Sequence, residues 1–136
     1  MPPSADPKLS SGIVLCIDDN QTVLECEKAF LETFGYTVLT ACSSGKALEL
    51  ASVHSVDVVI VDYLMPEMNG PEVAIEMRRL RPQAPIIMLS AAVDIPEQAL
   101  KLVDAFVPKD RLASQLLPTI AQLHGCESIP PASYDA

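Results

Sequence analysis

Five polar side chains stand where apolar runs of the sequence end, and together they could bind a cation and an anionic group. Asp18 and Asp19 follow Ile-Val-Leu-Cys-Ile, Asp62 follows Val-Val-Ile-Val, Ser90 follows Ile-Ile-Met-Leu, and Lys109 comes two residues after Ala-Phe-Val. Converging carboxylates repel one another and raise one another's pKa values unless a cation lies between them. Mg²⁺ suits such a place, because it takes about six oxygen ligands and keeps several waters.

The other two side chains favour phosphoryl chemistry at Asp62. The Lys109 ammonium is a fixed positive charge, and the Ser90 hydroxyl is a neutral donor. A cation, an ammonium and a hydroxyl around one carboxylate can cradle a phosphoryl group and neutralise charge on its oxygens. A carboxylate nucleophile needs no general base, because it is already ionised at neutral pH. Asp62 is therefore the expected nucleophile.

These residues can meet only if the apolar runs form neighbouring parallel strands. Continuous apolar runs bounded by turn residues are typical of strands buried on both faces. We predict strands at 13–17, 36–42, 58–61, 85–90 and 105–107, and helices at about 21–34, 43–53, 71–80, 94–103 and 111–124. This alternation predicts an α/β fold with a parallel sheet covered by helices on both faces. The polar residues should then gather at the edge where ligand sites of such sheets lie, beyond the carboxyl ends of the strands.

Two of the predicted helices contain residues that bear on their boundaries. The side chains expected to face inward from the first helix are Val23, Cys26, Phe30 and Phe34, with Leu24 and Leu31 beside them. Gly35 fits the left-handed position that ends many helices. In the last helix, Pro118 has no N–H and crowds the carbonyl of Ser114. That helix either begins near Ser114 or kinks at Pro118.

Length and composition fit one domain with an aliphatic core. The chain has 136 residues, 49 % of them hydrophobic, no Trp and a net charge of −9. The negative charge argues against a nucleic-acid partner, and no run approaches the roughly 18–20 apolar residues that span a membrane. We expect a domain at 12–124, flexible tails at 1–11 and 125–136, and a cytoplasmic location. Free thiols in a reducing compartment are the favoured state of the four cysteines.

The order of the polar positions resembles the receiver domain of two-component response regulators. Paired acids after the first strand, an Asp and then Met-Pro-Glu-Met-Asn-Gly after the third, Ser after the fourth and Lys after the fifth follow the family's pattern over about 12–124. The paired acids or the MPEMNG turn alone would be a moderate signal, whereas all positions in order make a strong one. The resemblance implies a flavodoxin-like, doubly wound five-stranded sheet with strand order 2-1-3-4-5.

The resemblance also implies how the acids would work. Asp62 would accept a phosphoryl group from a partner's phosphohistidine, carried by a histidine kinase or a histidine phosphotransfer protein. Asp19 and Asp62 would ligate Mg²⁺ together with the backbone carbonyl of Leu64. Asp18 would act on the metal mostly through water.

A second set of implied roles concerns the phosphoryl oxygens and the switch. Ser90 and Lys109 would hold those oxygens. Phe106 occupies the place of the rotating aromatic that, with Ser90, couples phosphorylation to the surface of the fourth helix, fifth strand and fifth helix. The shift of that surface would be a two-state change biased by phosphorylation.

Several residues depart from the family's pattern. The segment between the fourth and fifth strands is a few residues short, which predicts a truncated or shifted fourth helix. Asp104 stands where a glycine is common, and Phe106 lacks the hydroxyl of the commoner tyrosine. Leu64 and Ala92 are apolar at the positions that govern water access to the acyl phosphate in the family. We expect slow self-dephosphorylation for that reason.

The sequence therefore predicts a stand-alone receiver of a two-component system or phosphorelay. Its output would be contact with a downstream protein, with no nucleic-acid or membrane partner, and a homodimer stays open. It would not be an enzyme acting on a separate substrate, because it would catalyse only its own phosphorylation and dephosphorylation. One alternative is an aspartyl-phosphate phosphohydrolase, although those enzymes resemble one another in a DxD pair rather than adjacent acids. Another is a receiver-like scaffold that works without phosphorylation. Taken alone, Asp18 and Asp19 could simply be a turn and N-cap pair that opens the first helix.

Overall fold

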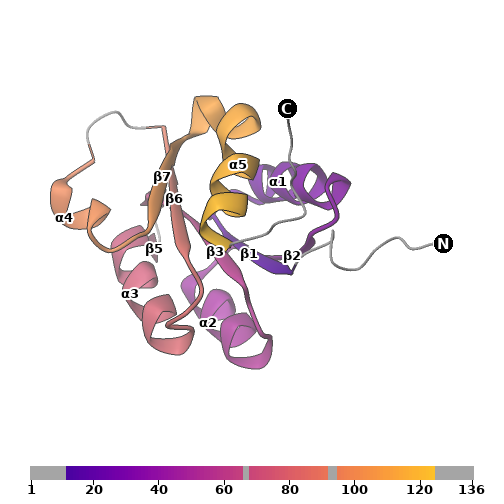
Figure 1. The fold of residues 1–136 in the computed structure, drawn as a ribbon. Helices are drawn as coiled ribbons and strands as arrows, with labels where there is room; N and C mark the ends of the chain where they lie inside the picture. Colours follow the sequence, from indigo (N-terminus) through magenta and orange to yellow (C-terminus); the bar gives the residue numbers. More distant parts are fainter. Residues whose placement is uncertain (1–11, 66–67, 92–94, 125–136) are drawn as a thin grey trace.

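Apolar strands and amphipathic helices build a layered fold around one parallel sheet. The computed structural model describes residues 12–65, 68–91 and 95–124. Helices α1 and α5 cover one face of the sheet, and α2 and α3 cover the other (Figure 1). The α/β class is therefore confirmed, whereas the predicted flexible tails lie outside the described residues.

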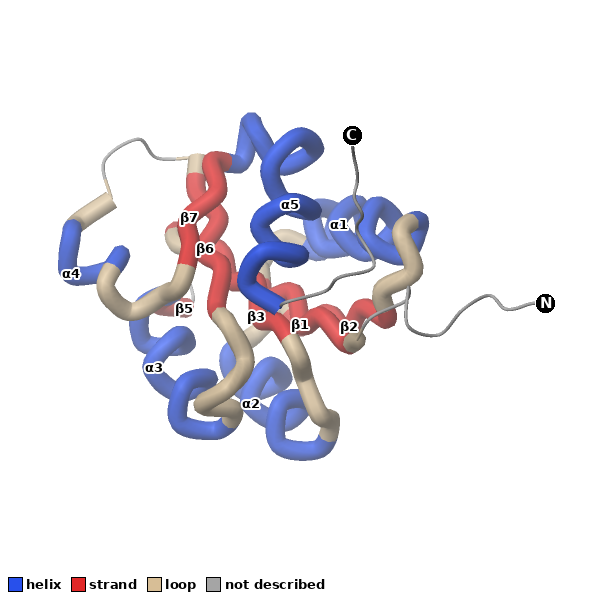
Figure 2. Tube along the Cα trace, in the orientation of Figure 1, coloured by secondary structure: helices blue, strands red, loops and turns tan. Residues whose placement is uncertain are grey.

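Five parallel strands form the main sheet in the order β2-β1-β3-β6-β7. Their bounds are β1 Ile13–Ile17, β2 Thr37–Ala41, β3 Val58–Asp62, β6 Ile86–Ser90 and β7 Ala105–Pro108. Counted among themselves, they have the predicted order 2-1-3-4-5. The central strands β1, β3 and β6 are also the most apolar, as strands covered on both faces should be. Figure 2 shows the five strands side by side between the helices.

The helices fill the connections between these strands. Their bounds are α1 Gln21–Thr33, α2 Ser44–Val53, α3 Gly70–Leu80, α4 Glu97–Leu100 and α5 Leu112–His124, with a short 3₁₀ helix at Lys109–Arg111. A feature absent from the prediction lies just after β3. There β4 (Leu64–Met65) and β5 (Met68–Asn69) form a two-residue antiparallel pair where the sequence indicated only a turn.

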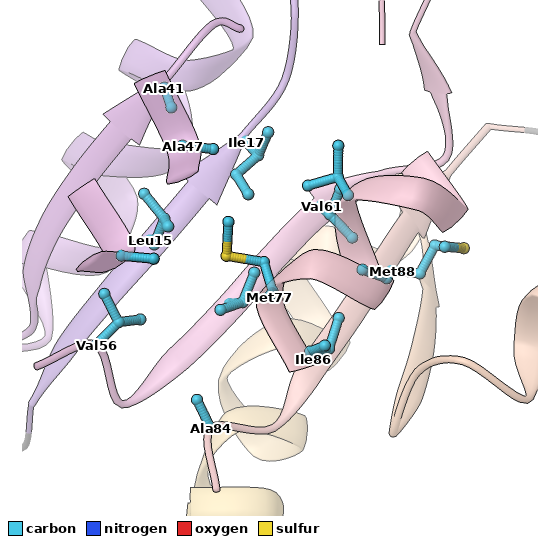
Figure 3. Packing of buried hydrophobic residues seen from close by; sticks show 14 residues of the cluster. Leu15, Ile17, Ala41, Ala47, Val56, Val61, Met77, Ala84, Ile86 and Met88 are labelled. Atoms are coloured by element: carbon cyan, nitrogen blue, oxygen red, sulfur yellow. The ribbon is translucent and has the colours of Figure 1, made fainter. Parts of the chain in front are cut away.

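Alternate residues of each strand enter two separate apolar clusters. Leu15 and Ile17 join the cluster beneath α2 and α3, and Met77 of α3 points toward both of them (Figure 3). Cys16 faces the other way, into the cluster beneath α1 and α5. Successive strand side chains point to opposite faces. The face that holds Cys16 therefore also holds Asp18, two residues on.

The predicted inward face of α1 is partly wrong: Leu24 and Leu31 are buried as expected and Phe30 packs against the core, but the buried stripe is centred one position further along. Cys26 is exposed and Phe34 is 50 % exposed, whereas the buried residues are Leu24, Glu27 and Leu31. The two stripes have the same helical spacing, so periodicity alone does not separate them. Glu27 was not among the residues predicted to face inward.

The ends of the first two helices follow local chemistry. The Asn20 side chain caps α1 by accepting a hydrogen bond from the N–H of Val23 (3.1 Å). Gly35 has φ 94°, and the N–H of Tyr36 donates to the carbonyl of Leu31 behind it. This is the left-handed glycine stop predicted for Gly35. Ser43 caps α2 by accepting from the N–H of Lys46 (3.2 Å); of the two serines at this helix start, the first is the cap.

The last two helices differ from their predicted lengths. Helix α4 is a single turn, so the predicted 94–103 is too long and the expected truncation is confirmed. Helix α5 begins at Leu112 and contains Pro118 in its interior, so a start near Ser114 is wrong. The missing N–H of Pro118 leaves the Ser114 carbonyl without its usual helical donor.

Two further expectations concern cysteines and membranes. Cys16, Cys26 and Cys42 are free thiols, as favoured, and Cys126 lies outside the described residues. Across 12–65, 68–91 and 95–124, no helix has both the length and the apolar character needed to cross a bilayer.

Candidate functional site at the carboxyl edge of the sheet

The carboxyl ends of the central strands bring together the five polar residues named from the sequence. β1, β3 and β6 are parallel and in register, so Ile17 pairs with Val61 and Asp62 with Leu89. Asp62 and Ser90 are the last residues of their strands, and Lys109 follows β7 directly. Asp62 belongs to β3 itself, one residue beyond the predicted end of that strand.

The first two acids continue β1 into the turn before α1. The N–H of Asp18 donates to the carbonyl of Ala41 (3.2 Å), which extends the pairing with β2 by one residue. The Asp18 carboxylate accepts from the N–H of Asn20 (3.0 Å) and is 2 % exposed. The N-cap part of the alternative interpretation is wrong, because Asn20 and not Asp18 or Asp19 caps α1, whereas Asp18 does form the turn that precedes the helix.

Backbone packing holds Asp62 against the start of α3. Gly70 is the first residue of α3, and a Cβ placed on it would lie 2.7 Å from the carbonyl oxygen of Asp62. No side chain fits at that distance without moving the backbone. Gly70 therefore allows α3 to begin immediately behind the strand end that carries the nucleophile candidate.

Lys109 lies between two of the buried carboxylates. Its Nζ donates to Asp18 Oδ2 at 3.2 Å and forms an ion pair with Asp62 Oδ1 at 3.1 Å. Asp62 is 4 % exposed, so this pair is largely removed from water. A buried carboxylate of this kind needs such a partner, because an unpaired buried charge is strongly destabilising.

The edge remains short of positive charge despite Lys109. Burial, and next the charge of Asp18, raise the pKa of Asp62 to about 6, although Lys109 acts in the opposite direction. For Lys109, burial favours the neutral amine, but the charge of Asp62 and its hydrogen bond outweigh this and raise the pKa. One lysine thus serves a cluster of acids whose negative charge it only partly balances.

The arrangement of the acids fits a hard divalent cation. One carboxylate oxygen from each of Asp18, Asp19 and Asp62 lies within 4.8 Å of the other two. Carboxylate oxygens are the ligands Mg²⁺ prefers, and two or three of them with waters can complete its coordination. A cation there would also relieve the repulsion that raises the pKa of Asp62.

The structure describes the remaining predicted positions only in part. Ser90 is buried at the end of β6, where its backbone pairs with Pro108. Leu64 lies in β4, two residues past Asp62, but its side chain and the whole of Ala92 lie outside what the structure describes. Phe106 is partly buried on β7 and packs against the cluster beneath α2 and α3. The assigned roles of these residues stay predictions.

One residue near the edge was missed from the sequence. Glu27 of α1 is 3 % exposed, and its carboxylate shares a hydrogen bond with the Cys16 thiol. Burial, and next the charge of Asp18, raise the pKa of Glu27 to about 7. The sequence signal for its burial was its position three residues after Leu24 and four before Leu31, which places it on the same helix face as these two leucines.

The chain is similar to known proteins of one signalling family. Residues 14–120 match the family described as the response regulator receiver domain. A probable transcriptional regulator, ycf27 of Cyanidium caldarium, is 37 % identical over 82 residues, which cover 60 % of this chain and 32 % of the relative. The matched part therefore spans about a third of that protein's length.

Solved structures match across most of the chain. The chemotaxis protein CheY4 of Vibrio cholerae has a TM-score of 0.76 at 30 % identity, covering 82 % of this chain and 98 % of that one. The response regulator TrrA of Thermotoga maritima, solved in complex with Mg²⁺-BeF, has the same TM-score, identity and coverage. Together with the family match over 14–120, these findings show that the chain belongs to the response regulator receiver domain family.

Proposed function

We propose that this chain is a phosphoacceptor, in which Asp62 takes a phosphoryl group from the phosphohistidine of a histidine kinase or phosphotransfer protein. The observation that carries the proposal is Lys109 Nζ, 3.2 Å from Asp18 and 3.1 Å from Asp62 at one buried edge. An anionic group bound at Asp62 would lie beside this ammonium. The fold family and the solved complex of TrrA with Mg²⁺-BeF support the same role.

In the proposed transfer, the Asp62 carboxylate attacks the phosphorus of the phosphohistidine. A P–O bond forms and the P–N bond breaks, leaving the electron pair on the imidazole nitrogen, which takes up a proton. Asp62 is ionised for most of the time at neutral pH, since its pKa is raised only to about 6. Lys109 and Ser90 would hold the transferring oxygens, where charge must be neutralised.

Asp18, Asp19, Asp62 and the backbone carbonyl of Leu64 would hold Mg²⁺. When bound, the metal would supply positive charge at the reacting oxygens. The pocket residues keep their own tasks: Asp18 orients Lys109 by accepting from its ammonium, and the buried strand ends limit the water around Asp62. Slow loss of the phosphoryl group, expected from Leu64 and Ala92, is part of this proposal.

For the output, we propose contact of the α4–β7–α5 surface with a downstream protein in the cytoplasm, with Ser90 and Phe106 as the switch. Phe106 connects β7 to the cluster beneath α2 and α3, against which Leu102 and Val103 of the segment after α4 also pack, so a change in its rotamer would be felt in β7 and in that segment. Although ycf27 is named a probable transcriptional regulator, the net charge of −9 favours a protein partner over direct contact with DNA. Action as a stand-alone receiver, with or without a homodimer, stays a prediction.

The test is incubation with Mg²⁺ and acetyl phosphate, followed by mass mapping of the labelled peptide. We expect one phosphoryl group on Asp62, lost when the metal is chelated and absent from Asp62→Asn. Asp110→Asn, a change at an exposed acid beside Lys109, is the matched control and should label normally. Labelling elsewhere, or repeated turnover of the phosphodonor by Asp62→Asn, would contradict the proposal.

A further inference from the structure

A fourth carboxylate lies on the same face of the sheet as the acidic pocket, one layer beneath it. Glu27 of α1 is 3 % exposed and packs beside Cys16, the β1 residue two positions before Asp18. Cys16 and Asp18 point to the same face because strand side chains alternate. Glu27 therefore lies under the pocket rather than on the outer surface of α1.

The surroundings of Glu27 do not neutralise it. Its Oε2 has no hydrogen-bond partner within the described residues, and its carboxylate shares only a weak hydrogen bond from the Cys16 thiol. No described ion pair involves Glu27. A buried charge without a partner is costly, so either the group holds a proton or a positive charge nearby must compensate for it.

The charged groups that act on Glu27 belong to the pocket. They are Asp18 of β1 and Asp62 of β3, which disfavour its ionised form, and Lys109, which favours it. On its own helix, Lys28 is turned outward into an exposed pair with Glu32, and residues 112–123 of α5 carry no charged side chain. Because Glu27 is buried, any change of charge in the pocket acts on it through a medium of low dielectric.

We propose that Glu27 tunes the affinity of the acidic pocket for divalent cations through its own charge, and that cation binding releases a proton from it. This inference rests on the metal site of the proposed function. An ionised Glu27 attracts the cation and strengthens binding. By linkage, the cation must favour ionised Glu27 by the same factor. The pocket should therefore bind Mg²⁺ more tightly as pH rises through neutrality, beyond the effect of Asp62.

The experiment compares Mg²⁺ binding to the wild type and Glu27→Gln by calorimetry at about pH 6 and about pH 8, on either side of the Glu27 titration. Gln keeps the shape and an acceptor for Cys16 but has no charge. We expect the variant to bind about fivefold more weakly at the higher pH and nearly equally at the lower one. Proton release on binding, measured in buffers of different ionisation enthalpy, should fall in the variant. Glu25→Gln, a change at an exposed position of the same helix, should match the wild type.

Equal binding by wild type and Glu27→Gln at the higher pH would overturn the inference, as would the same loss at both values. If the variant does not fold, the carboxyl ¹³C shift of Glu27 in the wild type decides the question. Its pKa must fall when Mg²⁺ is added, and an unchanged pKa overturns the inference. Failure of acetyl phosphate to label Asp62, with Mg²⁺ binding intact, would instead remove the proposed function and leave this coupling measurable.

Discussion

At the amino edge of the sheet, each of two carboxylates has a fixed backbone partner. Asp57 accepts from the N–H of Ile13 at the start of β1 (2.8 Å). Asp104 accepts from the N–H of Ile86 at the start of β6 (2.7 Å) and from Arg78 (2.8 Å). At the carboxyl edge, Asp18 also accepts from a backbone N–H, that of Asn20 (3.0 Å), but Asp18 and Asp62 share one lysine as their only ion-pair partner among the described residues.

The difference shows that one fold uses the same chemical group for opposite purposes. At the amino edge, the carboxylates satisfy strand N–H groups that would otherwise lack acceptors, which stabilises the fold. At the carboxyl edge, buried acids crowd together and raise the pKa of Asp62 to about 6. Carboxylates with raised pKa values are typical of functional sites, and here the ligand that would neutralise them is a cation.

The largest expected effect is the pH dependence of the free energy of unfolding, which the carboxyl-edge acids and Glu27 control. The pKa values of Asp62 and Glu27 are raised to about 6 and about 7 in the folded chain, above their ordinary values. The folded state therefore holds more protons than the unfolded state between about pH 4 and pH 7, and stability falls as pH rises through this window. We expect a loss of about 5 kcal/mol without Mg²⁺ from the two groups together, measured by urea unfolding. The double variant Asp62→Asn, Glu27→Gln should be nearly flat, and a wild type that gains stability over the window would contradict the comparison.

The next effect tests the amino edge. Asp104→Ala should destabilise the fold by about 2 kcal/mol, because the N–H of Ile86 loses a charged acceptor. Arg78→Ala is the control, since it removes the exposed ion pair alone and should cost at most about 0.5 kcal/mol. Both values come from chemical denaturation, and labelling of Asp62 should persist in both variants. If the two changes cost the same, Asp104 acts through Arg78 and not through the strand.

The smallest effect has the opposite sign and tests the carboxyl edge. At neutral pH, Asp62→Asn should stabilise the fold by about 1 kcal/mol, because removing the cost of burying a charge, together with the repulsion from Asp18, outweighs the loss of the Lys109 pair. The same denaturation assay without Mg²⁺ measures it. Asp19→Asn, at a less buried position, should gain less. A destabilised Asp62→Asn would mean that Lys109 fully balances the cluster.

The sequence pattern alone predicted the parallel strands and the residues gathered at the carboxyl edge, and the resemblance to the receiver family added the strand order. An apolar run such as that at 58–61 is typical of a central strand, and parallel strands bring their carboxyl ends to one edge. Gly35 and Ser43 marked helix ends because their preferences are local. These features depend on neighbours in the chain, so a linear pattern contains them.

Tertiary structure decided which face of α1 is buried, the length of α4 and the partners of each charge. The helix stripes that pass through Cys26 and through Glu27 are equally periodic. Only packing against Cys16 of β1 and against α5 decides that the stripe with Glu27 is the buried one. The position of Lys109 between Asp18 and Asp62 joins residues 91 and 47 positions apart, as their numbers show. Local preference does not determine such contacts, because they form only when strands from distant parts of the chain pair. The raised pKa of Glu27 exists only in the folded protein for the same reason.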